Sequence, residues 1–164
     1  MFGLFTSAPF HDDALGTFER SGGLWVGQLM LAPHGRVALR LAGDRKAPHP
    51  EALATARALP ARYATALPVI AAALFEHLEP YRDAEAPGDD ADCDLSTIAA
   101  AADVWPRVEV PYVTVDPSVR GFDAEVAYRV PWDEEHTLGA RLSAGALVEL
   151  CGSCLLYTSD AADE

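Results

Sequence analysis

The side chains most capable of chemistry lie in one short run near the end of the sequence: Trp132, Asp133, Glu134, Glu135 and His136. Two carboxylates and an imidazole suit a divalent cation, so Asp133, Glu135 and His136 are candidate metal ligands. A carboxylate paired with His136 is also a candidate acid–base pair, because an imidazole with an ordinary pKa near ~6.5 exchanges protons at neutral pH. Adjacent side chains of a strand point to opposite faces, so Glu135 and His136 meet only if the backbone turns there.

A structural role explains the same run without any chemistry. The acids can cap backbone amides in a polar loop between two strands, with His136 hydrogen-bonded locally and Trp132 packed at the edge of the core. We favour this interpretation because the sequence offers no second, distant ligand or nucleophile to complete a site. It predicts no catalytic residue, no metal site and no cofactor.

The remaining polar motifs indicate loops or core positions. The run D-D-A-D-C-D at 89–94 lacks the central glycine and the closing glutamate of an EF-hand calcium loop. The run H-D-D at 11–13 is typical of an exposed loop, and Ser7 has no G-x-S-x-G setting. His77 lies on the apolar face of a predicted helix, where we expect a hydrogen-bonded histidine at the edge of the core.

The run V-P-W-D-E-E-H-T-L-G-A-R at 130–141, followed by V-E-L-C-G-S at 148–153, resembles the C-terminal signature of a bacterial protein family. That family of small proteins is a domain of unknown function with W-D-E-E-H-x-L-G before its final strand pair. The order of strands and helices is similar over most of residues 1–153. The resemblance implies a natural chain that ends shortly after Ser153, and it implies no catalytic role for Asp133, Glu135 or His136.

The last eleven residues, C-L-L-Y-T-S-D-A-A-D-E at 154–164, resemble translated sequencing-adapter DNA at every codon. We therefore treat them as a non-native tail, exclude them from the prediction of the fold, and expect the natural chain to be truncated in a gene read from a short assembled fragment. The remaining 153 residues suit one domain with a single core. Of the three cysteines, Cys154 belongs to the tail, so no C-x-x-C pair remains.

Charge and hydropathy limit the classes of partner. The chain carries a net charge of −13, or −10 without the three acids of the tail. Such a surface repels nucleic-acid phosphates and anionic lipids. We also find no signal peptide and no run that approaches the ~20 apolar residues of a membrane span. The sequence thus predicts a cytoplasmic protein that binds neither nucleic acid nor membrane.

Hydrophobic periodicity predicts strands at both ends of the chain and helices between them. Alternation or apolar runs indicate strands at 15–20, 24–31, 36–41, 108–115, 122–130, 140–142 and 146–151. Helices are predicted at 51–59 and 95–104. Steps of three and four residues predict a further helix, with a kink or a new start at Pro68, whose buried face carries Tyr63, Leu67, Ile70, Leu74, His77 and Tyr81.

This order predicts the α+β class, with antiparallel strands at both ends of the chain packed against a central helical layer that joins the two sheet halves. For function we expect a small acidic protein-binding or accessory domain without catalytic activity, because acidic surfaces speed association with basic partners. The alternative is a metal-dependent or acid–base hydrolase that uses the Asp133, Glu135 and His136 segment. The oligomeric state stays open.

Overall fold

The structure, a computed structural model, describes residues 7–84 and 94–152. Most of the acidic run at 89–94 and the whole tail at 154–164 therefore lie outside the described residues. The strands are β1 (Phe10–Asp12), β2 (Gly16–Ser21), β3 (Leu24–Met30), β4 (Arg36–Leu41), β5 (Tyr112–Val115), β6 (Ala124–Val130), β7 (Asp133–Ser143) and β8 (Ala146–Gly152). The helices are α1 (Pro50–Ala84) and the 3₁₀ segments η1 (Leu95–Thr97) and η2 (Ala101–Arg107). The predicted α+β class is confirmed.

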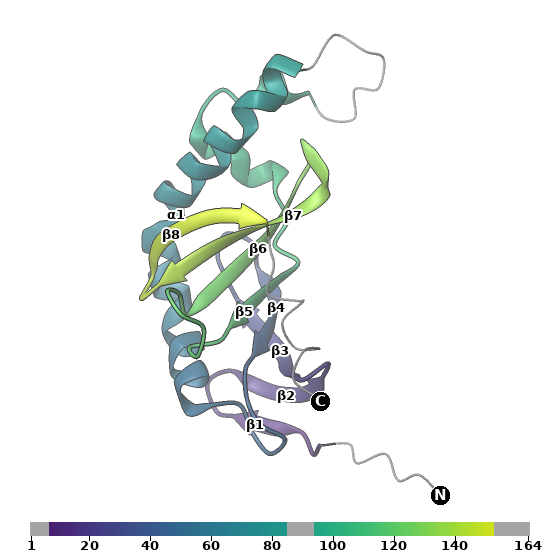
Figure 1. The fold of residues 1–164 in the computed structure, drawn as a ribbon, viewed down its shortest axis with the longest axis vertical. Coiled ribbons are helices and arrows are strands. Elements are labelled where there is room, and N and C mark those ends of the chain that lie inside the picture. Colours follow the sequence, from purple (N-terminus) through teal and green to yellow (C-terminus); the bar gives the residue numbers. More distant parts are fainter. Residues whose placement is uncertain (1–6, 85–93, 153–164) are drawn as a thin grey trace, which may run out of the picture.

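The described strands form one sheet in which spatial order follows chain order, from β1 to β8. Neighbours are antiparallel except β4 and β5, which pair in parallel with Leu39 opposite Val113. Parallel neighbours need a long crossover, and α1 with η1 and η2 supplies it. The two strand sets therefore join directly, side by side in one sheet, and not across a helical layer. Figure 1 shows α1 running along one face of the joined sheet.

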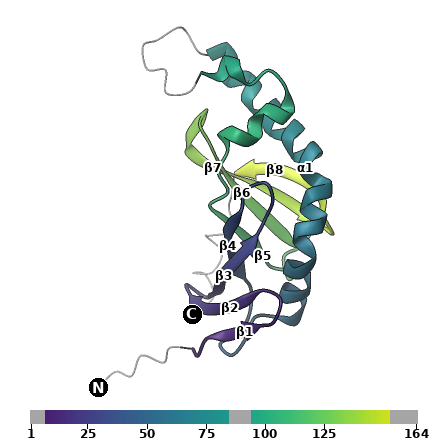
Figure 2. The ribbon, with the colours of Figure 1, turned by 180° about the vertical axis from the view of Figure 1, so that it is seen from behind.

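Helix α1 continues through 35 residues and three internal prolines, Pro60, Pro68 and Pro80. The predicted restart at Pro68 is therefore wrong. Each proline removes one backbone hydrogen bond. The carbonyls that Pro68 and Pro80 leave unpaired belong to Ala64 and Glu76, which are exposed and can bond to water. Helices that cover a core commonly curve with the convex side toward solvent. Figure 2 shows α1 bowed along the sheet in this way.

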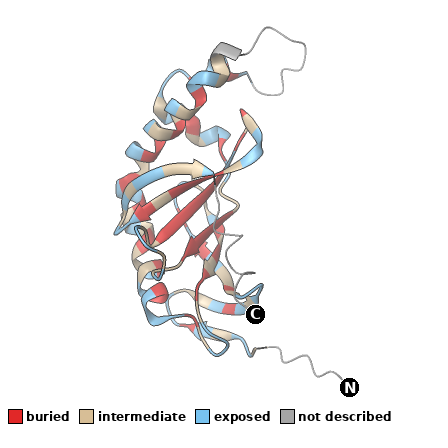
Figure 3. Cartoon of the chain, viewed as in Figure 1, coloured by how far each residue is buried: buried red, intermediate tan, exposed pale blue. Residues whose placement is uncertain are grey.

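The core lies between α1 and the sheet. The predicted helix face is confirmed where it is deepest, since Tyr63, Ile70 and Leu74 have no exposed surface. They face strand residues that are equally buried, such as Leu39 and Val113. Burying a large apolar side chain contributes about 1.5–3 kcal/mol, so this layer is the main source of stability. Figure 3 shows buried residues concentrated in the central strands and exposed ones along β8.

By length and composition alone, α1 could also cross a membrane, because a window within Pro50–Arg82 has a mean hydropathy of 1.4. The expectation that no segment approaches a membrane span is wrong in that limited sense. The core helix of a soluble protein passes the same test, and 33% of this window is buried inside the fold. The packing of α1 on the sheet accounts for the buried third of this window.

Two further predictions need correction: the one drawn from Pro111 and the helix at 95–104. Pro111 predicts an edge strand or a bulge, but β5 lies in the middle of the sheet, between β4 and β6. Pro111 is tolerated there because it immediately precedes the strand and need not donate to the ladder. The helix predicted at 95–104 is instead split into η1 and η2, and the carboxylate of Asp94 caps η1 by accepting from the amide of Ser96.

The second face of the sheet carries a row of charged side chains in register. Arg40 lies opposite Thr114, Thr114 opposite Glu125, Glu125 opposite Arg141, and Arg141 opposite Glu149. Glu125 is fully buried and accepts from Nε of Arg141 at 3.1 Å, while Nη1 of Arg141 donates to Glu149 at 2.6 Å. A one-residue slip would separate these charges, so the row fixes the register of β6, β7 and β8.

Gly139 makes room for the buried carboxylate of this row. A Cβ atom at position 139 would lie 2.7 Å from Cδ of Glu125, which Arg141 holds in place. We predict that Gly139→Ala lowers the free energy of unfolding by about 1–3 kcal/mol, measured by chemical denaturation. The control is Gly152→Ala, whose Cβ meets nothing within 4 Å and should change stability by less than ~0.5 kcal/mol. Equal effects of the two substitutions would contradict this account of the packing.

Candidate functional site

The segment predicted as a polar loop is part of strand β7, which begins at Asp133. Between the pairs Tyr128–Leu138 and Val130–Asp133, β6 contributes one residue and β7 contributes the four residues 134–137. We call this segment the β7 bulge. Surplus residues on one strand leave the ladder and bend the backbone. The bend supplies the turn that the sequence alone could not establish.

Asp133 is the centre of a hydrogen-bonded cluster at the base of the bulge. Its Oδ1 accepts from Nδ1 of His136 at 2.7 Å, and its Oδ2 accepts from the hydroxyl of Tyr81 at 2.9 Å. Beside it, Nε1 of Trp132 donates to Nδ1 of His77 at 3.0 Å, and the His77 and Tyr81 rings are in contact, tilted by 32° with centroids 5.5 Å apart. Two side chains of α1 thus fasten the hairpin to the helix.

Electrostatics favour the charged forms of Asp133 and His136. Burial of the carboxylate, whose side chain is 10% exposed, opposes ionisation, but hydrogen bonds from His136 and Tyr81 outweigh it and lower the pKa of Asp133. The same hydrogen bond to Asp133 raises the pKa of His136. The hydrogen bond that the Tyr81 hydroxyl donates to Asp133 raises the pKa of Tyr81. The pair is therefore a short ion pair at the pH where both groups are charged.

The candidate residues come together only in part. Asp133 and His136 meet, whereas Glu134 and Glu135 are exposed on the bulge and form no hydrogen bond with either in the described structure. Within residues 7–84 and 94–152, no group of three or more His, Cys, Asp or Glu side chains is placed to hold a metal ion. The metal-ligand interpretation therefore gains no support from the geometry, and an aspartate–histidine pair is the chemistry that remains.

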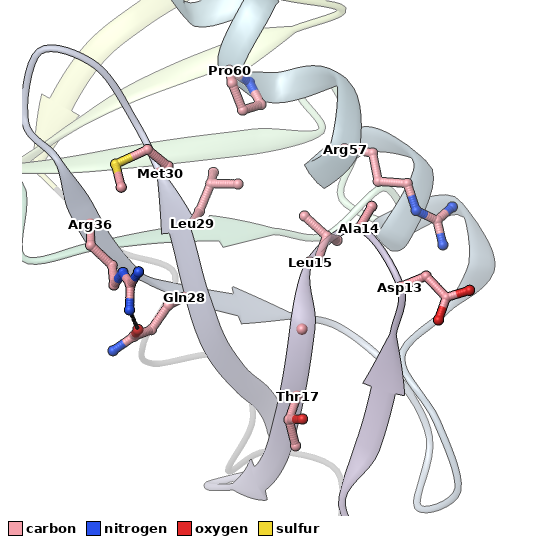
Figure 4. Close-up of a pocket in the computed structure, with 11 residues that line it drawn as sticks. Asp13, Ala14, Leu15, Thr17, Gln28, Leu29, Met30, Arg36, Arg57 and Pro60 are labelled. Atoms are coloured by element: carbon pink, nitrogen blue, oxygen red, sulfur yellow. Dashed lines mark hydrogen bonds between the residues drawn. The ribbon is translucent and has the colours of Figure 1, made fainter.

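A cleft of about 690 Å³ lies away from this pair, between the β1–β2 turn, β3 and α1, and is drawn in Figure 4. Leu15, Leu29 and Pro60 point into it, and Arg36 bonds Gln28 at its rim at 3.4 Å. This groove, whose lining also includes Asp13, Thr17 and Arg57, lies at the opposite end of the molecule from the bulge, so it offers Asp133 and His136 no substrate pocket.

A second polar network lies in the core and was not predicted from the sequence. Nε2 of His34 and the hydroxyl of Tyr63 are 2.8 Å apart, and the hydroxyls of Tyr63 and Tyr128 are 2.7 Å apart. Both tyrosines have no exposed surface, and burial raises the pKa of each. Local patterns assign Tyr63 and Tyr128 to the core and His34 to a turn, so the one available signal is that buried phenols need partners.

Counting protons gives the direction of these hydrogen bonds. If Nε2 of His34 accepts from Tyr63, Tyr63 can accept from Tyr128 and every hydroxyl proton is used. If Nε2 donates instead, the Tyr128 proton has no acceptor among the described residues. Burial also lowers the pKa of His34, which favours its neutral form. The network therefore holds neutral His34 with its proton on Nδ1.

Comparisons with known proteins give no identification: no family model matches the chain, and no curated protein and no solved structure matches it significantly. The resemblance of 130–141 to a bacterial family signature thus stays a prediction.

We predict that His136 titrates above its ordinary pKa of ~6.5 and returns toward that value in Asp133→Asn, measured from the His136 ring protons by NMR. The raised pKa of His136 and the lowered pKa of Asp133 give a stabilisation that is complete between pH ~4 and ~6.5. It is lost as the pH rises through the His136 value or falls through the Asp133 value. Glu134→Gln is the control and should leave the titration close to that of the wild type.

The proton count predicts unequal effects of removing the two buried hydroxyls. Tyr63→Phe leaves the Tyr128 hydroxyl buried without a partner and should cost about 1–3 kcal/mol of unfolding free energy. Tyr128→Phe leaves Tyr63 bonded to His34 and should cost ~1 kcal/mol or less. The double variant Tyr63→Phe/Tyr128→Phe also removes the unpaired Tyr128 hydroxyl and should be no less stable than Tyr63→Phe. A larger loss for Tyr128→Phe than for Tyr63→Phe would contradict the assigned direction.

Proposed function

We propose that this protein is a small acidic cytoplasmic domain that binds a basic partner protein through the β7 bulge and has no catalytic activity of its own. One observation carries the proposal: two adjacent exposed carboxylates, Glu134 and Glu135, lie on a bulge whose base is fastened by the bonds of Asp133 to Tyr81 and His136. A fastened, exposed and charged hairpin is suited to recognition of another surface.

Pre-ordering of the bulge supports binding because association costs less when the contact residues are already fixed. Ordering a flexible side chain at an interface costs roughly 0.5–1.5 kcal/mol, and loop ordering adds to this. In this fold, the cost of shaping the bulge is met on folding by the contacts of Asp133 and Trp132 with α1. Glu134 and Glu135 then need only exchange water for a cationic partner.

The net charge of the chain, more than the charges beside the bulge, favours a cationic partner. Glu76 is exposed on α1 beside His77 and adds to the carboxylates of the bulge, whereas Glu79 forms an ion pair with Arg82. Arg129, the β6 residue opposite the bulge, is also exposed. The whole chain carries −13, and a field of this sign steers cationic surfaces toward it and repels nucleic acid and anionic lipid. Charge complementarity therefore favours a lysine- or arginine-rich protein surface as the partner.

An acid–base hydrolase is the second candidate, and the 2.7 Å bond between Asp133 and His136 is the observation that favours it. An aspartate that orients a histidine is the usual arrangement of a general base. Against this role, the His136 side chain is 67% exposed, so water competes with any substrate. Hydrolysis of p-nitrophenyl esters that falls more than tenfold in both Asp133→Asn and His136→Ala would support the hydrolase and contradict the binding proposal.

The binding proposal is tested by selecting peptides from a displayed random library on the wild-type protein. We expect the selected peptides to be rich in Lys and Arg and to bind at least tenfold more weakly to Glu134→Gln/Glu135→Gln. The matched control, Asp13→Asn/Glu19→Gln, removes two exposed charges at the opposite end of the molecule and should change the affinity less than twofold. Equal losses in the two double variants would contradict a specific role for the bulge.

A further inference from the structure

A cavity of about 400 Å³ adjoins His34, between the β3–β4 turn, η2 and the segment that leads into β5. Its wall includes Val37 and Val108, which are buried, and the ring of Trp105. The volume falls within the range of small-molecule sites, about 300–1,000 Å³, and such sites combine apolar walls with a few placed polar groups. The polar groups of this cavity decide which ligand it suits.

His34 supplies the first of these groups. Its Nδ1 has no hydrogen-bond partner among residues 7–84 and 94–152. In the same residues, the buried side-chain atoms without a hydrogen-bond partner are Nη1 of Arg40 and Nε of Arg82. Because His34 lines the cavity and its Nε2 accepts from Tyr63, Nδ1 carries a proton that a ligand in the cavity can accept.

Arg36 supplies the second group. It lines the same cavity, is exposed, and has one hydrogen bond in the described structure, a long one of 3.4 Å to Gln28. Its guanidinium is thus available to a carboxylate, for which its paired donors are well shaped. Glu109 also lines the cavity but is exposed, so water screens its repulsion of an anion.

The aromatic character of the wall indicates the rest of the ligand. Trp105 meets the His34 ring edge-on, with centroids 5.5 Å apart and an interplanar angle of 67°. A planar ring laid beside them could pack against the indole, because aromatic rings attract one another beyond the area that they bury. A flat ligand uses this wall better than a puckered aliphatic ring of similar size.

We propose that this cavity binds a small aromatic carboxylate, with its ring against Trp105 and its carboxylate accepting hydrogen bonds from Nδ1 of His34 and from Arg36. The tyrosine pair behind His34 holds the imidazole in the tautomer that presents this donor. The site is separate from the β7 bulge and does not depend on protein binding there. The two proposals can therefore fail independently.

The test uses benzoate as the probe, added to the ¹⁵N-labelled full chain at pH 7 and followed by the indole N–H signal of Trp105. We expect a saturable shift with benzoate, and dissociation constants at least fivefold weaker for benzamide, which lacks the charge, and for cyclohexanecarboxylate, which lacks the aromatic ring. Arg36→Gln should weaken benzoate at least fivefold and leave benzamide unchanged.

The matched control is Arg45→Gln, which removes an exposed arginine that does not line this cavity and should bind benzoate as the wild type does. Because Arg36 and Arg45 are both exposed, neither substitution should prevent folding, and the dispersion of amide signals verifies this directly. Absence of a saturable Trp105 shift with benzoate would overturn the proposal. Equal weakening by Arg36→Gln and Arg45→Gln would overturn it as well, since it would indicate attraction to net charge rather than a site.

Discussion

The burial of one face of α1 against the sheet is the interaction on which the rest of the structure depends. With η1 and η2, the helix belongs to the crossover that connects β4 to β5 and allows these two strands to pair in parallel. The same helix carries Tyr63 into the core and Tyr81 to the base of the hairpin. Its placement therefore fixes both the His34 network and the Asp133 cluster.

Local periodicity was enough to predict the elements whose burial alternates along the chain. Strand β4 was predicted at its observed bounds, and the buried face from Tyr63 to Leu74 followed from three- and four-residue spacing. Continuity of α1 through Pro68 and the central place of β5 after Pro111 were not predictable in this way. They depend on which side of a helix faces solvent and on which distant strand pairs with which.

The candidate site, like the fold, could be predicted from the sequence only in part. Residue density singled out the 132–136 run, but the contact between Asp133 and His136 depends on three surplus residues in β7 relative to β6, and no local pattern encodes that register. The network of His34, Tyr63 and Tyr128 joins residues 29 and 65 positions apart, and each alone is typical of a turn or a core position. Buried polar contacts of this kind appear only once the strands and the helix are assembled.

We assign the Asp133 cluster a mechanical role, which is to hold an exposed acidic bulge rigid for binding. The most direct test is ¹⁵N relaxation of the backbone amides of residues 133–137 in the unbound protein. We predict order parameters near ~0.85, equal to those of β6, and a fall below ~0.6 in Asp133→Asn. Order parameters below ~0.6 already in the wild-type protein would contradict the claim, because the bulge would then be a flexible loop despite its bonds to α1.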